Sequence, residues 1–517
     1  MPCTTILVGK NASYDGSTIV ARNEDSGSAG FRPKKFAVVL PADQPRRYRS
    51  VISHLEIDLE AEGEPMRYSS LPDALDDRGI WAEAGVNEAN VSMSATETLT
   101  TNERVLGADP LVELKPARGV EGEPGYEAEV PGGIGEEDMV TLVLPYIGSA
   151  REGVLRLGGL LERFGTYEMN GIAFSDVDEI WWLETVGGHH WIARRVPDDA
   201  YVTMPNQLGI DRFDLNDAFG DQREYLCSAD LREFMAANHL DLTLGCSEGV
   251  GVFNPREAFG SHSDSDHVYN TPRSWAIQRF LNPHAQDWDA SVAGSSADAL
   301  DAPFGPESDD IPWCRVPERK ITIEDVKYAL SLHYQGTPYD PYGRRGDAST
   351  RGMYRPIGIN RNGQLSVVQL RPYVPDAVCA VQWIAFGCNV FNALVPFYAN
   401  VDTVPEYLAN TTGKVSTESF YWANRLVAAL ADAQYRLNSI HIERYQQKVG
   451  ALGHALIAEG DASIAERELD YADAAPALAA VNERIAAALR EATDDLLDKV
   501  LFETSMHMKN AFSRADG

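Results

Sequence analysis

The 517-residue chain lacks long hydrophobic runs: no apolar stretch reaches the roughly 18 residues that a membrane-spanning helix needs. The N-terminus also lacks the basic flank and apolar core of a secretory signal peptide, so we expect a cytoplasmic protein. Cysteine is scarce, with six residues in all, and no CxxC pair occurs. This spacing indicates neither a structural zinc site nor a redox dithiol, and a disulfide framework is not expected at this size.

Basic residues are fewer than acidic ones. The chain carries 45 Lys and Arg against 77 Asp and Glu, which gives a formal net charge of −32. Such a field repels nucleic acid and anionic lipid, so we expect neither a nucleic acid nor a membrane as a partner. Solubility is the plain interpretation of this charge, and a preference for cationic or zwitterionic ligands is the weaker alternative.

The order of expected elements favours an α+β fold of antiparallel sheets over a doubly wound parallel one. Strand-like segments fill the first hundred residues, and a meander of strands follows over residues 171–206. Residues 101–137 are irregular and acidic, which indicates an insertion or a lid. Residues 406–517 are rich in Ala, Leu and Glu, and predict a helical extension packed on a catalytic domain of residues 1–405. These helices are alternatively an oligomer contact, and we expect a homo-oligomer.

Two further patterns predict helices in the middle of the chain. Residues 222–238 have a helical pattern. Thr322, followed three residues later by Asp325, resembles a capping box that opens a helix reaching about His333.

Cys3 is the most informative residue, because it stands two residues from the start and directly before the strand-like run Thr4–Val8. Removal of the first two residues would leave it with both a thiol and a free α-amine. The reference pKa values of these groups are about 8.5 and about 8. An amine of this kind can deprotonate the nucleophile on its own residue. The alternative is an incidental cysteine near a frayed end.

The first hairpin predicts the partners of Cys3. If its turn centres on residues 12–13, opposed residues have an index sum of about 25, which places Arg22 opposite Cys3 within a residue or two. A guanidinium there stabilises a thiolate. Asp25, three residues on, is expected to accept a hydrogen bond from the new α-ammonium or to fix Arg22. The alternative is a surface Arg–Asp pair at a strand end.

Asn206 follows the last strand of the meander and stands directly behind a proline. A side-chain amide in that place can donate a hydrogen bond to a developing oxyanion. Most asparagines in such positions cap a turn, and position alone does not decide between the two.

A metallopeptidase is the first rival interpretation. His262, Asp264, Asp266 and His267 are close in sequence, and the segment GGHHW contains two adjacent histidines, but no HExxH motif occurs. Adjacent residues of a strand point to opposite faces, so we do not expect the paired histidines to share a metal. No cofactor is expected.

Seven segments together resemble the bacterial cysteine dipeptidases of the N-terminal-nucleophile hydrolase superfamily. They are CTTILVG (3–9), ARNED (21–25), WAEAGVNEAN (81–90), SATET (94–98), IWWLET (180–185), GGHHW (187–191) and YNTPR (269–273). The matches run from residue 3 to beyond residue 390, and in combination they are specific.

The resemblance implies a four-layer αββα core, autoprocessing that exposes the cysteine, and hydrolysis of dipeptides. It also links the chain to the choloylglycine hydrolases and penicillin V acylases. No asparagine stands where those relatives have a second oxyanion donor, and Thr96 is the nearest candidate. The catalytic residues that the resemblance implies are Cys3, Arg22, Asp25, Asn206 and Thr96, with Arg273 as a substrate-binding residue.

Pro2 separates the initiator Met1 from Cys3, which sets a chemical requirement. A nitrogen acylated by Pro2 is an amide and cannot act as a base, so Met1 and Pro2 must be lost before this mechanism operates. Two alternatives stay open: an amidase that cleaves N-acyl amides by the same chemistry, and a non-enzymatic scaffold. The trio of Cys3, Arg22 and Asp25 argues against a scaffold.

Overall fold

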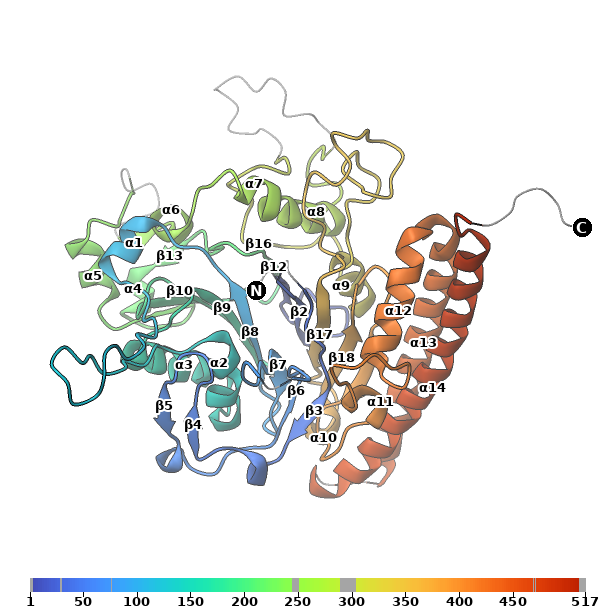
Figure 1. Cartoon of the computed structure of the whole chain (residues 1–517), viewed down its shortest axis with the longest axis horizontal. Helices are drawn as coiled ribbons and strands as arrows, with labels where there is room; N and C mark the ends of the chain where they lie inside the picture. The colour runs from blue at the N-terminus through green and yellow to red at the C-terminus, as the bar shows by residue number, and fades with distance from the viewer. Residues whose placement is uncertain are drawn as a thin grey trace, which may run out of the picture.

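A computed structural model describes residues 3–27, 30–75, 77–243, 251–288, 304–467, 469 and 471–510 (Figure 1). A seven-stranded sheet has the order β16-β12-β1-β2-β17-β18-β19, and a six-stranded sheet has the order β14-β11-β10-β9-β8-β7. The ladders between these strands are antiparallel, which agrees with the expected α+β class.

The strands of the seven-stranded sheet are β1 (Thr4–Val8), β2 (Thr18–Asp25), β12 (Tyr201–Met204), β16 (Cys314–Arg315), β17 (Asn362–Leu370), β18 (Ala380–Phe386) and β19 (Val395–Tyr398). Those of the six-stranded sheet are β7 (Ala84–Val86), β8 (Ser92–Thr98), β9 (Asn170–Ser175), β10 (Ile180–Thr185), β11 (Trp191–Arg195) and β14 (Tyr225–Cys227). Three small ribbons pair β3 (Ala37–Val39) with β6 (Tyr68–Ser70), β4 (Arg47–Arg49) with β5 (Glu56–Asp58), and β13 (Phe213–Asp214) with β15 (Val252–Phe253).

The helices before the C-terminal region are α1 (Glu103–Ala108), α2 (Glu136–Val143), α3 (Ala150–Phe164), α4 (Leu215–Ala218), α5 (Leu231–Ala237), α6 (Pro255–Phe259), α7 (Asp266–Tyr269), α8 (Thr271–Leu281), α9 (Ile323–Ala329) and α10 (Asp376–Cys379). The C-terminal region contains α11 (Glu406–Ala409), α12 (Phe420–Ala433), α13 (Tyr435–Arg467) and α14 (Tyr471–Met506). Within the described part of the chain, no helix is both long and apolar enough to cross a bilayer.

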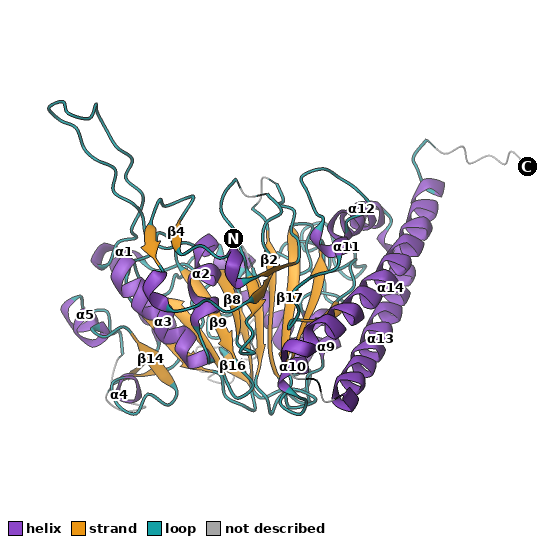
Figure 2. Ribbon diagram, turned by 90° about the horizontal axis from the view of Figure 1, so that it is seen from below, coloured by secondary structure: helices purple, strands orange, loops and turns teal. Residues whose placement is uncertain are grey.

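The two large sheets pack face to face, with helices outside both. Leu7 and Val20 of one sheet share a buried cluster with Ala173, Trp182 and Ile192 of the other. Helices α2 and α3 pack on the outer face of the six-stranded sheet, while α8, α9 and α12–α14 pack on that of the seven-stranded sheet (Figure 2). The alternation of apolar residues along each strand supplies both faces of each sheet.

The C-terminal helices pack on the seven-stranded sheet. Ile442 of α13 and Val500 of α14 belong to the same buried cluster as Val381 of β18. Asn482 of α14 accepts a hydrogen bond from the backbone N–H of Tyr398 (2.9 Å) and donates one to its carbonyl (3.0 Å). The amide of Asn482 thus takes the place of a further strand beside β19, which protects this sheet edge.

Residues 222–238 differ from expectation, and so does the end of the helix that Thr322 opens, which lies at Ala329 rather than near His333. Residues 222–238 are not one helix, because Leu226 pairs with Ala193 and places β14 on the sheet edge ahead of α5. In 101–137, bridges Lys115–Val130 and Arg118–Glu127 hold together a loop that projects away from the sheets (Figures 1 and 2). Thr322 and Asp325 cap α9 reciprocally.

Candidate active site

Cys3 lies directly before β1 and is fully buried. Strand β1 is held between β2 and β12 in the middle of the sheet, so the position of Cys3 is fixed by two ladders. Thr5 pairs with Arg22, which differs by two residues from the central expectation and falls within its range. An even shift keeps a side chain on the same face, so Arg22 still points toward Cys3.

Arg22 contacts the sulfur of Cys3. Its Nη2 lies 2.9 Å from Sγ and 3.0 Å from Oε1 of Glu136, and the side chain is only 1% exposed. Its Nη1 donates to a carboxylate oxygen of Glu83 and to the carbonyl oxygen of Ala95. A buried cation in contact with the sulfur favours the thiolate over the thiol.

A network of buried charges extends from Arg22 into the protein. Lys34 is fully buried, with Nζ 2.9 Å from Glu24, 2.8 Å from Asp73 and 3.3 Å from Glu83. Glu83 has a φ of +60°, a conformation that costs a residue other than glycine roughly 1–2 kcal/mol. The network was missed by sequence reasoning, because its members come from segments that are distant along the chain.

Carboxylates outnumber cations in this network. The cations are Arg22, Arg32 and Lys34, and the buried carboxylates are Glu24, Asp73, Glu83 and Glu136. Among the described residues, the Lys34 ammonium is the one cation within ion-pair distance of the Glu24 carboxylate. Burial raises the pKa of Glu24 to about 8, against the opposing attraction of Lys34. Glu24 therefore binds a proton more tightly in the folded chain than in the unfolded one.

The raised pKa of Glu24 predicts that the free energy of unfolding depends on pH. A carboxyl whose pKa rises from 4.5 to about 8 on folding gives its full contribution below pH 4.5 and loses it as the pH rises toward 8. The free energy of unfolding should fall across this window by up to about 1.4 kcal/mol per pH unit. In Glu24→Gln this slope should flatten, as measured by urea unfolding at several pH values. Glu459→Gln, at an exposed pair with Arg484, is the control and should keep the slope; an unchanged slope in Glu24→Gln would contradict the assignment.

The glycine cluster at residues 132–135 brings Glu136 to Arg22. A Cβ on Gly133 would lie 2.6 Å from the backbone of Gly165, and one on Gly135 would lie 2.1 Å from the hydroxyl of Tyr167. Only glycine allows so close an approach, and α2 begins immediately afterwards with Glu136. The glycines were therefore a signal for tight packing beside the site.

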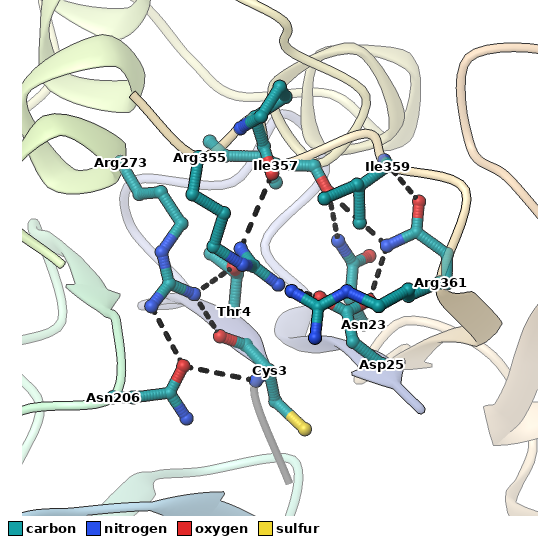
Figure 3. Close-up of polar contacts among 12 residues, drawn as sticks. Cys3, Thr4, Asn23, Asp25, Asn206, Arg273, Arg355, Ile357, Ile359 and Arg361 are labelled. Carbon is teal, nitrogen blue, oxygen red and sulfur yellow. Dashed lines mark hydrogen bonds and ion pairs between the residues drawn. The ribbon is translucent and has the colours of Figure 1, made fainter. Parts of the chain in front are cut away.

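Asn206 contacts the backbone nitrogen of Cys3 (Figure 3). Its Oδ1 accepts hydrogen bonds from that nitrogen (3.2 Å) and from Nη2 of Arg273 (2.7 Å), and its Nδ2 donates to the carbonyl of Thr98 (3.0 Å). The amide is thus held in one orientation at the head of β1. The structure brings Asn206 and Cys3 together across a separation of 203 residues.

Arg273 is fully buried on α8 and donates to acceptors of the protein on every side. Its Nη1 bonds the carbonyl of Cys3 and Oγ1 of Thr4 (2.8 Å). Its Nη2 donates to Oδ1 of Asn206 and to Oδ1 of Asn270 (2.8 Å). Its Nε donates to the carbonyl of Tyr269 (2.7 Å). A guanidinium has five N–H groups, so none is left for a substrate carboxylate. This geometry suits a positioning role better than the expected substrate-binding role.

Asp25 points to the face of β2 opposite Arg22, since an odd separation reverses the side chain. Its carboxylate accepts hydrogen bonds from Arg355 (Figure 3) and from Asn362. Within the described part of the chain, it does not contact Arg22. Fixing of Arg22 by Asp25 is therefore not what the structure shows.

Arg355, which sequence reasoning missed, comes from the loop before β17. It is 7% exposed, and its Nε has no hydrogen-bond partner among the described residues. Burial lowers the pKa of Arg355, as does the nearby Arg361, whereas a Cys3 thiolate raises it. Arg355 is thus a buried cation with an unused donor, and its charge interacts with the nucleophile.

Thr96 lies at an irregularity of β8, where the register shifts between Ala95 and Glu97. Its side chain lies outside what the structure describes, as do Met1 and Pro2. Thr96 as a second oxyanion donor therefore stays a prediction.

The histidines of the rival metal interpretation are engaged in other contacts. His189 and His190 both direct Nδ1 to Asp109, at 2.9 and 2.7 Å. The expectation that they point to opposite faces was wrong, because β11 begins only at Trp191. His262 and His267 contact different acids, Glu257 (3.8 Å) and Asp309 (2.8 Å). In the described ranges, no group of three or more His, Cys, Asp or Glu side chains could hold a metal ion.

Comparison with known proteins places the chain in a family. Residues 2–448 match the model of Peptidase family C69. The chain is 59% identical to a dipeptidase of Bifidobacterium longum (strain NCC 2705), with all of both chains covered. It is 53% identical to a probable dipeptidase A of Streptococcus pyogenes serotype M3 (strain SSI-1), again over all of both chains, and 45% identical to dipeptidase A of Lactobacillus helveticus over 97% of this chain and 96% of the relative.

These matches define a peptidase. The chain belongs to peptidase family C69, which confirms the expected kinship with bacterial dipeptidases.

Proposed function

We propose that this protein is a cysteine-type dipeptidase in which Cys3, freed of Met1 and Pro2, is the nucleophile. The observation that carries the proposal is the contact of Sγ with the buried Arg22 at 2.9 Å, while the nitrogen of the same residue meets Asn206 at 3.2 Å. Membership of family C69 and the printed names of the relatives support a peptidase that acts on dipeptides.

The layer order supports assignment to the N-terminal-nucleophile hydrolases. Two antiparallel sheets lie between helices, and the proposed nucleophile heads a central strand. The backbone nitrogen of Cys3 is a peptide nitrogen until Pro2 is lost. Processing then converts it to an amine at a place where Asn206 already offers an acceptor oxygen.

The mechanism needs only groups at this site. The α-amine takes the thiol proton, and the thiolate attacks the carbonyl carbon of the dipeptide's peptide bond. Nδ2 of Asn206 and a donor near Thr96 stabilise the oxyanion. The C–N bond breaks as the α-ammonium gives its proton to the departing amine, which leaves a thioester on Cys3. Water hydrolyses the thioester, releases the second product and restores the thiol.

Arg273 positions these groups without meeting the substrate. Its guanidinium ties the carbonyl of Cys3 to Oδ1 of Asn206, so the nucleophile and the proposed oxyanion donor share one rigid support. Such preorganisation is what a proposed oxyanion site needs, because the donor must be in place before charge develops.

Arg355 is the group that we assign to the substrate's carboxylate. A charge-assisted hydrogen bond is worth about 1.5–3 kcal/mol, so Arg355→Gln should lower kcat/KM for dipeptides by about 10- to 100-fold, mainly through KM. Activity on the corresponding dipeptide amides, which lack that carboxylate, should change little. Arg351→Gln, on the exposed part of the same loop, is the matched control. Equal losses on dipeptides and their amides would assign Arg355 a purely structural role.

The test of the proposed function is intact mass and N-terminal sequencing of the purified protein, run beside hydrolysis of a dipeptide panel. The expected result is an active chain that begins at Cys3. N-acylated amino acids are included as substrates, because preference for them would favour the amidase alternative. Full activity in a chain that still carries Pro2 would overturn the mechanism.

A further inference from the structure

A cavity of about 700 Å³ lies away from Cys3, between α9 and α13 on the outer face of the seven-stranded sheet. Its apolar wall includes Ile323, Trp383, Val390, Leu394 and Ile442. A volume of this size with a mainly apolar lining is typical of small-molecule sites. The proposed hydrolysis makes no use of this space.

Lys327 supplies the cavity with a single unneutralised cation. Its Nζ donates to Oγ of Ser331 (2.9 Å) and to the carbonyl of Asn389 (2.5 Å), which leaves the third N–H of the ammonium. No carboxylate of the described residues lies within ion-pair distance of it. Burial lowers the pKa of Lys327 to about 7, so a bound carboxylate would favour the ammonium over the neutral amine.

The carboxylates that line the cavity do not form ion pairs with Lys327. Glu324 is paired with His454 and Asp325 with Arg319, both at 2.6 Å, while Glu443 is exposed at the rim. An anion that enters the cavity would therefore meet one half-buried cation and an apolar wall. One positive charge matches a monocarboxylate better than a phosphate dianion, whose second charge would be buried unpaired.

Hydrogen bonds connect this cation to the proposed active site. Asn389, whose carbonyl holds Lys327, donates from its backbone N–H to Oδ1 of Asn362 (3.1 Å). Nδ2 of Asn362 in turn bonds Asp25, the partner of Arg355. The side chain of Asn389 also donates to Oδ1 of Asn23 on β2 (2.6 Å). A change at Lys327 therefore has a continuous route to Asp25, of the kind that can carry coupling between sites.

We propose that the cavity between α9 and α13 is an effector site for a monocarboxylate with an apolar body, which binds through Lys327 and acts on the active site through Asn389 and Asn362. The carboxylate accepts a hydrogen bond from the third N–H of the Lys327 ammonium, and the apolar body packs against the wall around Trp383. Binding stands on the cavity alone, whereas the effect on hydrolysis rests on the proposed dipeptidase function.

Calorimetric titration with octanoate tests the site on the full-length protein, and octanamide is the neutral counterpart. We expect saturable binding of octanoate and at least tenfold weaker binding of octanamide. Lys327→Met should weaken octanoate at least tenfold, while Lys448→Met, on an exposed part of α13, should not. Equal affinities for octanoate and octanamide, or equal affinities of Lys327→Met and the unaltered protein, would overturn the proposal.

Gly450→Leu provides a second variant that keeps Lys327. Gly450 lines the cavity, and a Cβ there would meet no atom within 4 Å, so a leucine can grow into the space without a clash. It should block octanoate while leaving the fold intact, because leucine also favours the helix. Unimpaired binding in Gly450→Leu would place the ligand elsewhere.

Coupling between the cavity and the proposed active site is measured by dipeptide hydrolysis in the presence of saturating octanoate. We expect kcat/KM to change at least twofold, and this change should be absent in Lys327→Met. Binding that leaves kcat/KM unaltered would overturn the effector role, and this outcome differs from a protein that hydrolyses no dipeptide at all.

Discussion

Replacement of Cys3 by alanine is expected to lower kcat for dipeptide hydrolysis by at least about 10⁴-fold, because loss of a nucleophile removes the covalent route altogether. Cys3→Ser should be nearly as inactive. A serine hydroxyl is not ionised at neutral pH, so the cation at 2.9 Å would have no thiolate to stabilise. The measurement is steady-state hydrolysis of a dipeptide panel, with circular dichroism to show that each variant is folded.

Cys379→Ala is the matched control. Cys379 is also buried, but burial raises the pKa of its thiol to about 11, so it stays a neutral thiol at pH 7 and its loss should leave the rate unchanged. The same contrast predicts selective labelling. Iodoacetamide at pH 7 should modify Cys3 of the processed protein before Cys227, Cys314, Cys379 or Cys388, all of which have raised pKa values. Substantial activity in Cys3→Ala would end the proposed mechanism.

The first hairpin shows how far local sequence reasoning reaches. Thr4–Val8 was expected as a strand and has these bounds as β1, and Arg22 was expected on the same face as Cys3 and contacts its sulfur. The register differed by two residues from the central expectation, because the connection between the strands centres on residues 13–14 and not on residues 12–13. The prediction survived because an even shift preserves the face of the sheet.

Contacts between distant segments were beyond sequence reasoning. Nothing near Arg355 indicates that it meets Asp25, 330 residues away, and the pairing arises only when β17 docks beside β2. Nothing in the sequence around Lys34 indicates that it is buried among three carboxylates. Residues 222–238 have a helical pattern, but pairing with β11 outweighs helix propensity over Tyr225–Cys227. In each case tertiary contact decides the outcome.

Arg22 is the second residue whose replacement should have a large effect, and two consequences can be separated. In Arg22→Gln, Glu83 and Glu136 lose a buried cation, which should lower the free energy of unfolding by about 3–5 kcal/mol. The Cys3 thiolate loses the same cation, so the midpoint of its alkylation by iodoacetamide should move up by at least about one pH unit. Arg22→Lys keeps the charge but loses the planar guanidinium with its paired N–H groups. Its free energy of unfolding and its alkylation midpoint should therefore lie between those of the unaltered protein and Arg22→Gln.

Arg32→Gln distinguishes a chemical role for Arg22 from a structural one. Arg32 pairs with Asp73 in the same network but does not contact the sulfur. Its loss should therefore reduce stability without moving the alkylation midpoint of Cys3. If Arg22→Gln also left that midpoint in place, Arg22 would be a support for Glu83 and Glu136 only, and the activation of the thiol would have to come from its own α-amine. A shift confined to the Arg22 variants would instead show that the network exists to hold a cation against the sulfur, because the stability that the two arginines share cannot account for a change at one thiol.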